Sequence, residues 1–225
     1  MNKFNRLSIV IPVGPGDRSW RHLLSDLAVF GDRIEIVLSA CEAQPDDFEL
    51  PAAVRWLQGA RGRAQQLNAG ARATGNRFIW FLHADSRLTI AVVAVMARYL
   101  QTDGRRLGYF RLRFASDGPI LTRLNAWAAN RRSRWFGLPF GDQGLIVERS
   151  VFEHLTGFDE AVSLGEDLDF VVRARAAGFE LRELPAELIT SARRYRQCGW
   201  LATTFRHIWL TWRLTREASR RLALT

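Results

Sequence analysis

Residues 77–85 read RFIWFLHAD. Five apolar residues, from Phe78 to Leu82, are followed at once by His83 and Asp85. A short, unbroken apolar run bounded by polar residues is typical of a strand that is buried on both faces of a sheet. We therefore predict a buried strand over residues 77–82, with the carboxylate of Asp85 in the loop that follows it.

Similar apolar runs precede this strand. Strands are predicted at residues 7–13 (LSIVIPV), 34–38 and 54–57, and helices at residues 20–30, 62–74 and 89–100. Apolar strands that alternate with helices are typical of an α/β fold with a mostly parallel, mixed sheet and helices on both faces. Such sheets bind ligands at the carboxyl ends of their strands. We therefore expect the loops at residues 14–17, 40–42 and 83–85 to line one crevice.

The second half of the chain has a mixed pattern. It predicts strands at residues 108–114, 145–147 and 180–184, and helices at residues 120–135, 150–155, 167–177 and 201–221. Pro185 is expected to end the last strand, because proline has no N–H to donate to a sheet. We find no internal repeat or linker. The prediction is one domain over residues 1–197, followed by a helical tail over residues 198–225.

The positive charge is concentrated at the end of the chain. The 225 residues carry a net charge of +9, and residues 193–225 alone hold eight arginines and one acid, Glu217. An apolar stripe lies among these arginines, formed by Leu201, Phe205, Ile208 and Trp212. A basic amphipathic helix of this kind predicts contact with an anionic membrane surface. The alternative is that the stripe packs on the domain and the arginines are solvated.

Several classes of function are disfavoured by what the sequence lacks. Lys3 is the only lysine, which excludes a phosphate-binding P-loop with its Gly-Lys pair. Cys41 and Cys198 do not have the spacing of a metal site. We recognise no nucleic-acid-binding motif, and therefore expect no nucleic-acid partner. With no signal peptide and no apolar run of transmembrane length, we expect a cytoplasmic protein, with the tail peripheral on the inner face of the membrane.

Two acidic positions could carry chemistry. A carboxylate such as Asp85 at the ligand edge of a sheet suits Mg²⁺ or Mn²⁺, which bind oxygen ligands; alternatively it caps the next helix. Residues 165–170 read GEDLDF, which puts Glu166 beside Asp167. Neighbouring carboxylates raise each other's pKa and suit a general base. The alternative is that they interact only with the dipole of a helix N-terminus.

Taken together, these motifs resemble those of the family 2 glycosyltransferases, which have the GT-A fold. In order, they are residues 7–12 (LSIVIP), 62–70 (GRAQQLNAG), 78–86 (FIWFLHADS), 141–144 (GDQG), 157–160 (GFDE) and 166–167 (ED). The resemblance covers roughly residues 7–200. The sequences of these motifs are most similar to those of a small bacterial branch of the family, which is associated with radical-SAM/selenodomain proteins.

The resemblance implies an enzyme that moves a sugar, with inversion at its anomeric carbon, from a nucleotide-sugar donor to an acceptor hydroxyl. Lipid-linked acceptors are among the candidates. It implies that Asp85 binds Mg²⁺ or Mn²⁺ as the last position of a D-x-D-like motif and that Asp167 is the general base. The implied donor-binding residues are Pro12, Asp17, Glu42, Arg63, Asn68, His83, Ala84 and Arg194, with Arg193 as a further candidate for the diphosphate. Asp142, Gln143 and Glu166 would face the acceptor.

Two loops on the donor side depart from the family pattern. Residues 12–17 (PVGPGD) lack the family's usual acid after the first strand, and residues 39–42 (SACE) replace an acidic segment that contacts the base. Asp17 and Glu42 are the residues that could substitute. Two alternatives therefore remain open: a nucleotidyltransferase on a similar sheet, and a non-catalytic nucleotide-binding or scaffold protein on a degraded GT-A fold.

Overall fold

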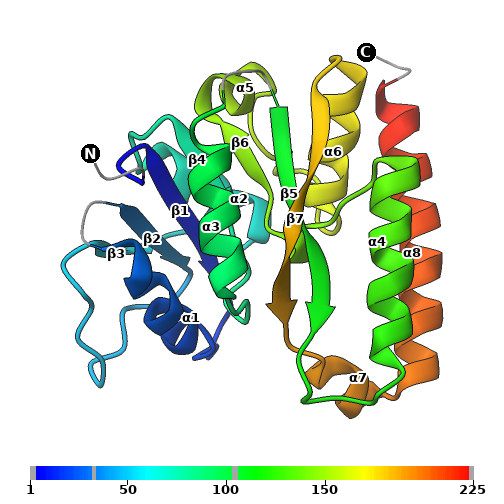
Figure 1. Cartoon of the computed structure of the whole chain (residues 1–225), viewed down its shortest axis with the longest axis horizontal. Helices are drawn as coiled ribbons and strands as arrows, with labels where there is room; N and C mark the ends of the chain where they lie inside the picture. Colours follow the sequence, from blue (N-terminus) through cyan, green and yellow to red (C-terminus); the bar gives the residue numbers. More distant parts are fainter. Residues whose placement is uncertain (1–3, 32–33, 103–105, 223–225) are drawn as a thin grey trace.

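One seven-stranded sheet runs through the part of the chain that the structure describes (Figure 1). The computed structural model describes residues 4–31, 34–102 and 106–222. The strands are β1 (Leu7–Val13), β2 (Glu35–Ala40), β3 (Val54–Gln58), β4 (Phe78–Phe81), β5 (Arg106–Phe114), β6 (Ile146–Glu148) and β7 (Glu180–Thr190). Their order is β3-β2-β1-β4-β6-β5-β7, and only β6 runs antiparallel to its neighbours. The predicted mixed, mostly parallel sheet is confirmed.

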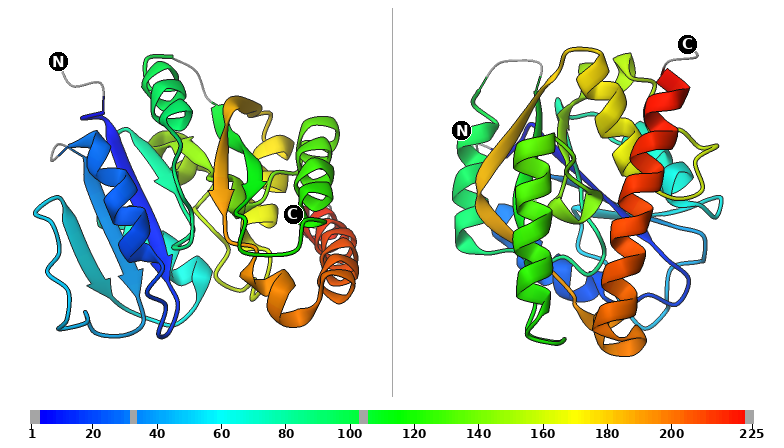
Figure 2. Two further views of the ribbon diagram at one scale, coloured as in Figure 1. Left: turned by 60° about the horizontal axis from the view of Figure 1, so that its bottom comes forward. Right: turned by 90° about the vertical axis from the view of Figure 1, so that its right-hand side faces the viewer.

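Helices cover both faces of the sheet, as predicted (Figures 1 and 2). On one face pack α1 (Trp20–Leu27) and α3 (Ile90–Tyr99), and on the other α2 (Arg63–Arg72), α5 (Arg149–His154) and α6 (Glu166–Ala176). Beyond the β5–β7 end of the sheet lie α4 (Thr122–Phe136), α7 (Arg193–Cys198) and α8 (Trp200–Leu222). Short 3₁₀ turns span Ala28–Phe30 and Gly141–Gln143.

The alternation of side chains along β1 explains why its sequence is apolar throughout. Ile9 and Ile11 pack into the core on the α1 side of the sheet, and Val10 into the core on the α2 side. Pro12 fits in this central strand because pairing with β4 ends at Val10, whose carbonyl accepts from the N–H of Leu82. The backbone nitrogen of Pro12, which carries no hydrogen, faces that same side of the strand, where the ladder has already ended.

The last strand is longer than the sequence predicts. β7 continues through Pro185, which we expected to end it at residue 184, and reaches Thr190. Pro185 and Ala186 form a bulge: Leu184 pairs with Phe110, and the next pair is Glu187 with Arg111. A bulge at a sheet edge accommodates a residue that cannot donate a hydrogen bond. The extension brings Thr190 next to Asp85 at the ligand edge.

The C-terminal helix packs against the rest of the molecule along one side. Leu214 and Ala218 of α8 join Leu168 and Val172 of α6 in a small apolar cluster. Gly165, at the start of α6, permits this approach, since a Cβ there would lie 2.6 Å from Cδ1 of Leu214. Among the described residues, no helix combines the length and the apolar character needed to cross a membrane.

Candidate functional site

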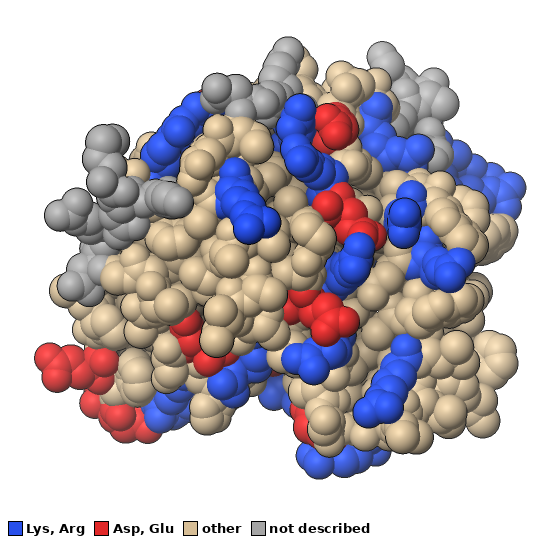
Figure 3. All heavy atoms as spheres, in the orientation of Figure 1, with Lys and Arg blue, Asp and Glu red and all other residues tan. Residues whose placement is uncertain are grey.

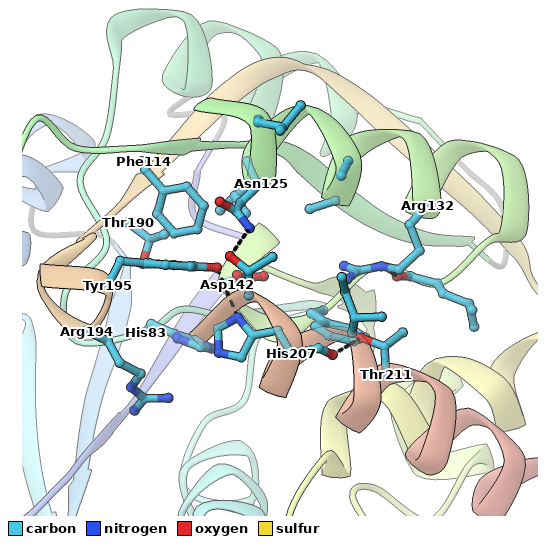
Figure 4. Close-up of a pocket in the computed structure, with 18 of the residues that line it drawn as sticks. His83, Phe114, Asn125, Arg132, Asp142, Thr190, Arg194, Tyr195, His207 and Thr211 are labelled. Atoms are coloured by element: carbon cyan, nitrogen blue, oxygen red, sulfur yellow. Dashed lines mark hydrogen bonds between the residues drawn. The ribbon is translucent and has the colours of Figure 1, made fainter. Parts of the chain in front are cut away.

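A cleft of about 1120 Å³ opens at the carboxyl ends of the central strands (Figure 4). Its walls come from the loop after β4, from α4, and from the C-terminal segment that begins at the end of β7. The charged and titratable side chains that line it are Arg63, His83, Asp85, Arg132, Asp142, Arg193, Arg194, Tyr195, His207 and Arg216. The sequence motifs around Asp85 and Asp142, which are far apart in the chain, therefore meet in one cavity.

Asp85 lines this cleft from the loop that follows β4. Burial raises the pKa of its carboxyl, and the nearby charge of Asp17 raises it further, whereas Arg193 opposes the rise. Oδ1 of Asp85 accepts a long hydrogen bond of 3.4 Å from Oγ1 of Thr190. The carboxylate thus keeps lone pairs for a ligand in the cleft.

Arg63, the first residue of α2, links the two acidic motifs. Its Nε lies 2.6 Å from Oε1 of Glu166, and its Nη2 contacts Nε2 of His83. Burial, followed by the charges of Arg63 and Arg194, holds the pKa of His83 well below its usual value. A neutral imidazole can accept from the guanidinium at Nε2. Burial and then Asp167 raise the pKa of Glu166, against the effect of Arg63.

Asp167 lies beside this network. Its Oδ2 accepts from the backbone N–H of Gly141 at 2.5 Å, and its Oδ1 from that of Leu168 at 2.8 Å. A Cβ on Gly141 would lie 2.8 Å from that Oδ2, 2.9 Å from Nε2 of His83 and 3.0 Å from Nη2 of Arg63. Gly141 therefore sits where these three side chains converge. Arg63 and His83 line the cleft, and Asp167 lies next to them beside Gly141 without lining it.

Asp142 faces the cleft directly (Figure 4). Burial raises the pKa of its carboxyl to about 6; Arg132 opposes the rise, and Asp167 adds to it. Its Oδ1 is buried and makes no hydrogen bond to any residue that the structure describes. An unpaired buried oxygen costs free energy unless a ligand satisfies it, so this atom is suited to a hydroxyl donor in the cleft.

The predicted donor-side loops form a second hollow next to the cleft. Glu42, after β2, accepts from the backbone N–H of Gly16 at 3.0 Å, and its carbonyl accepts from Nε1 of Trp56 at 2.9 Å. Together with Asp17 these residues line a cavity of about 160 Å³. Arg193 connects the hollow to the cleft, because its Nη2 lies 3.6 Å from Oδ2 of Asp17. The three loops predicted to line one crevice thus line two neighbouring hollows: residues 14–17 and 40–42 line the smaller one, and residues 83–85 contribute to the cleft.

Six predicted site residues line neither the cleft nor the smaller hollow. Two of them, Glu166 and Asp167, contact the residues around the cleft as described above, and the other four lie deeper in the fold. Gln143 is fully buried: its amide nitrogen donates to the Phe110 carbonyl at 3.0 Å, and its Oε1 accepts from Ser133 at 2.6 Å. Ala84 packs into the core, and Pro12 is buried within β1. Asn68 is the fourth. In this structure these residues support the walls of the cleft instead of facing a ligand.

Asn68 ties α2 to the turn at residues 157–160. Its Nδ2 donates to the Phe158 carbonyl at 2.8 Å and to Oε1 of Glu160 at 2.9 Å, and its Oδ1 accepts from the Phe158 N–H at 2.9 Å. The side chain is only 5% exposed, so the bonds cannot be replaced by bulk water. Two motifs of the resemblance are thus joined by a structural contact.

We predict that Asn68→Ala lowers the free energy of unfolding by about 2–4 kcal/mol, because it leaves buried backbone groups of Phe158 unpaired. The measurement is urea denaturation followed by circular dichroism. Gln65→Ala is the control: Gln65 makes one exposed bond, of 3.2 Å, to the Glu160 carbonyl, and its loss is expected to cost less than about 1 kcal/mol. Unchanged stability together with lost nucleotide binding would instead place Asn68 in the donor site.

Sequence reasoning missed four further polar residues of the cleft, Arg132, Thr190, Tyr195 and His207. Arg132 approaches the ring of Phe140 to 3.7 Å and donates from Nε to the Leu138 carbonyl at 3.0 Å. The hydroxyl of Tyr195 lies 3.0 Å from Nδ1 of His207, which joins α7 to α8 (Figure 4). Thr190 could have been found only by extending β7 through its proline. The other three stand on helices in a polar sequence, where nothing distinguishes a cleft residue from a solvated one.

The described residues could hold a divalent cation only together with ligands from the substrate and from water. Residues 4–31, 34–102 and 106–222 contain no group of three or more His, Cys, Asp or Glu side chains that could hold a metal ion by themselves. Mg²⁺ and Mn²⁺ are commonly bound by one or two carboxylates, with substrate phosphates and water as the other ligands. The carboxylate of Asp85, close to the arginines of the cleft, meets that requirement.

Comparison with known proteins places the fold. No family model matches the sequence, and no curated protein does. Among solved structures, TarS 1-349 from S. aureus has a TM-score of 0.64 at 14% identity, over 83% of this chain and 60% of that one. TarS 1-349 in complex with UDP-GlcNAc also gives 0.64 at 14% identity, over 83% of this chain and 58% of that one.

A second protein gives the same result. The mannosyltransferase PcManGT from Pyrobaculum calidifontis, in complex with GDP-Man and Mn²⁺, has a TM-score of 0.61 at 15% identity, over 82% of this chain and 56% of that one. The chain therefore spans 60% or less of the length of these three structures. At such identities the likeness bears on the fold alone, and it shows that the chain has a GT-A-like glycosyltransferase fold.

Proposed function

We propose that this protein is a glycosyltransferase that moves a sugar from a nucleotide-sugar donor to an acceptor hydroxyl, with inversion at the anomeric carbon. The observation that carries the proposal is the cleft itself. At the carboxyl edge of a GT-A-like sheet, Asp85, Asp142 and five arginines line one cavity, and Asp167 lies beside it, next to Gly141. Fold and charge arrangement together favour a diphosphate-bearing sugar donor.

The donor is proposed to lie across the two connected hollows. Its nucleoside would occupy the smaller cavity beside Asp17 and Glu42, and its diphosphate would extend into the cleft toward Arg193 and Arg194. Guanidinium groups suit this role because they form paired hydrogen bonds with phosphate oxygens. The neutral state of His83 avoids adding a further charge next to Arg63.

The proposed cofactor is Mg²⁺ or Mn²⁺, held by Asp85 and by the donor phosphates. Such an ion, when bound, supplies positive charge that stabilises the leaving nucleoside diphosphate. The remaining neutralisation comes from the chain itself, through the arginines of the cleft. A Mn²⁺ complex of the structurally similar PcManGT supports this choice of ion.

The acceptor is proposed to enter from the side of α4 and α8. There the unpaired Oδ1 of Asp142 can accept a hydrogen bond from an acceptor hydroxyl. We propose Asp167 as the general base that removes the hydroxyl proton as the oxygen attacks the sugar. The N–H of Gly141 fixes the orientation of its carboxylate, and Arg63 keeps the adjacent Glu166 in an ion pair.

A screen of nucleotide-sugars tests this function. We expect one or more of them to raise the thermal unfolding temperature in the presence of Mn²⁺, and the same compound to release its nucleoside diphosphate when an acceptor is present. Release of pyrophosphate would identify a nucleotidyltransferase instead. The absence of any shift with nucleotide-sugars or nucleoside diphosphates would favour a non-catalytic protein.

We predict that Gly141→Ala lowers the rate of transfer by about 10- to 100-fold, because the new methyl group displaces Asp167, His83 or Arg63; overpacking of this kind costs about 1–3 kcal/mol. The measurement is the initial rate at saturating donor. Gly59→Ala is the matched control, since a Cβ at Gly59 meets no atom within 4 Å, and its rate should equal that of the wild type. Equal rates for both variants would show that the space at Gly141 is not needed for the reaction.

A further inference from the structure

The α4 and α8 helices expose a large apolar surface on the side of the molecule that faces the viewer in the right-hand view of Figure 2. We refer to it as the α4–α8 face. Its residues are Leu121, the N-cap of α4; Leu124, Trp127, Trp135 and Phe136 of α4; and Leu201, Phe205, Ile208, Trp209 and Trp212 of α8. They are between 48% and 68% exposed. Apolar patches of this extent on soluble proteins mark interaction sites.

The two halves of the face are held in fixed relation. Nε1 of Trp200 donates to Oδ1 of Asn125 at 2.6 Å, and Nδ2 of Asn125 donates to Oγ1 of Thr204 at 3.0 Å. On its other side α8 packs on α6 through Leu214 and Ala218. The apolar residues therefore point outward because the opposite side of α8 is already used in the core contact.

The charge of the two helices is strongly positive. In the sequence, α4 and α8 together contain nine arginines and a single acid, Glu217. The right-hand margin of the surface in Figure 3, over these helices, shows arginines and no acidic side chain. The tryptophans and arginines of the face are also paired. The guanidinium of Arg131 lies 4.9 Å from the ring of Trp127 and 4.7 Å from that of Trp135.

Two further pairs of this kind lie on α8. Arg213 is 5.3 Å from the ring of Trp209, and Arg216 is 5.3 Å from that of Trp212. Tryptophan prefers the boundary between lipid tails and headgroups, and arginine is attracted to anionic headgroups. Each pair thus offers an apolar ring and a cation at the same depth of a lipid surface.

From these observations we propose that the α4–α8 face docks on an anionic phospholipid surface. A second copy of the chain is a poorer partner, because it would bring two arginine-rich faces together. The cleft adds a second reason, since four residues of the face also line it: Leu124, Phe136, Ile208 and Trp212. A protein docked in this way opens its cleft toward the bilayer.

Vesicle flotation of the full chain tests the proposal. We expect binding to vesicles that contain phosphatidylserine and phosphatidylcholine, much weaker binding to phosphatidylcholine alone, and weakening by salt. The double variant Arg131→Glu, Arg216→Glu is expected to bind about 25-fold more weakly or worse, since each arginine near an anionic surface contributes about a fivefold factor. The matched control Arg98→Glu, Arg182→Glu changes the net charge equally, on exposed residues away from the face, and should bind like the wild type.

A second pair of variants tests the apolar part. Trp127→Ala, Trp209→Ala removes one exposed ring from each helix and is expected to weaken vesicle binding by about tenfold or more. Val29→Ala, Ile90→Ala is the control, because these residues are 59% and 91% exposed elsewhere on the surface. All four variants alter exposed side chains, and thermal unfolding checks that each is folded.

Two results would overturn the proposal. One is equal binding of the wild type and the variants of the face to anionic vesicles. The other has three parts: the wild type does not bind vesicles, sedimentation shows that it is a dimer, and the Trp127→Ala, Trp209→Ala variant is a monomer. That outcome would assign the face to self-association. Because neither measurement uses a sugar donor, the result is independent of the proposed transfer activity.

Discussion

Asp167→Asn is expected to lower the rate of sugar transfer by about 10²- to 10⁴-fold, the usual contribution of a general base. The asparagine oxygen can still accept from the N–H of Gly141, which Asp167 binds at 2.5 Å. The local geometry should therefore survive while the ability to take up a proton is lost. The measurement is a single-turnover rate at saturating donor and acceptor, together with the Kd of the donor, which we expect to stay within about twofold.

Two variants serve as comparisons. Asp159→Asn changes a carboxylate that caps the N–H of Ala161 in the turn at residues 157–160 and should leave the rate unchanged. Asp142→Asn keeps an oxygen in the cleft and is expected to raise the KM of the acceptor with a smaller effect on kcat. If Asp142→Asn abolished transfer and Asp167→Asn did not, Asp142 would be the base. Its pKa of about 6 would suit that role.

Asp85→Asn is expected to weaken the Mn²⁺-dependent binding of a nucleoside diphosphate by about 30-fold or more, the effect of removing one member of a desolvated charge pair. The asparagine oxygen can retain the contact with Thr190, so the change removes charge with little change in shape. Isothermal titration calorimetry with and without Mn²⁺ gives the two affinities.

The control for this variant is the metal itself. In EDTA, the wild type and Asp85→Asn should bind the nucleoside diphosphate equally weakly, because only the arginines then contribute. Asp46→Asn, an exposed change in the loop after β2, should behave like the wild type under both conditions. An undiminished effect of Mn²⁺ in Asp85→Asn would mean that other residues hold the ion.

The fold could be predicted because its central strands are buried on both faces. Residues 7–13 and 77–82 carry unbroken apolar runs, and only a strand with a helix layer on each side gives such a pattern. The start of α3 follows an equally local rule: threonine favours N-cap positions, and the side chain of Thr89 accepts from the N–H of Val92 there. Pro185 misled the prediction, since a proline rule derived for regular ladders does not hold at a bulge.

The site could be predicted only in part, since a motif gives the position of a residue and not the direction of its side chain. Asp85 and Asp142 lie in loops at the ligand edge, where the fold leaves their carboxylates facing the cleft. Asn68 and Gln143 belong to similarly clear motifs, but their amides satisfy buried backbone groups. Arg132 and His207 face the cleft because α4 and α8 fold over it, which depends on packing between elements far apart in the chain.

The bulge at Pro185 has a further consequence, for association between copies of the chain. β7 is an edge strand of eleven residues, and a long open edge can act as a template for aggregation. Its first half ends in the bulge and carries the exposed residue Arg182. Near its end, Ile189 exchanges two backbone hydrogen bonds with Arg87, of 2.8 and 3.1 Å. The proline bulge, the charge of Arg182 and the loop that carries Arg87 together prevent a strand of another chain from pairing along this edge.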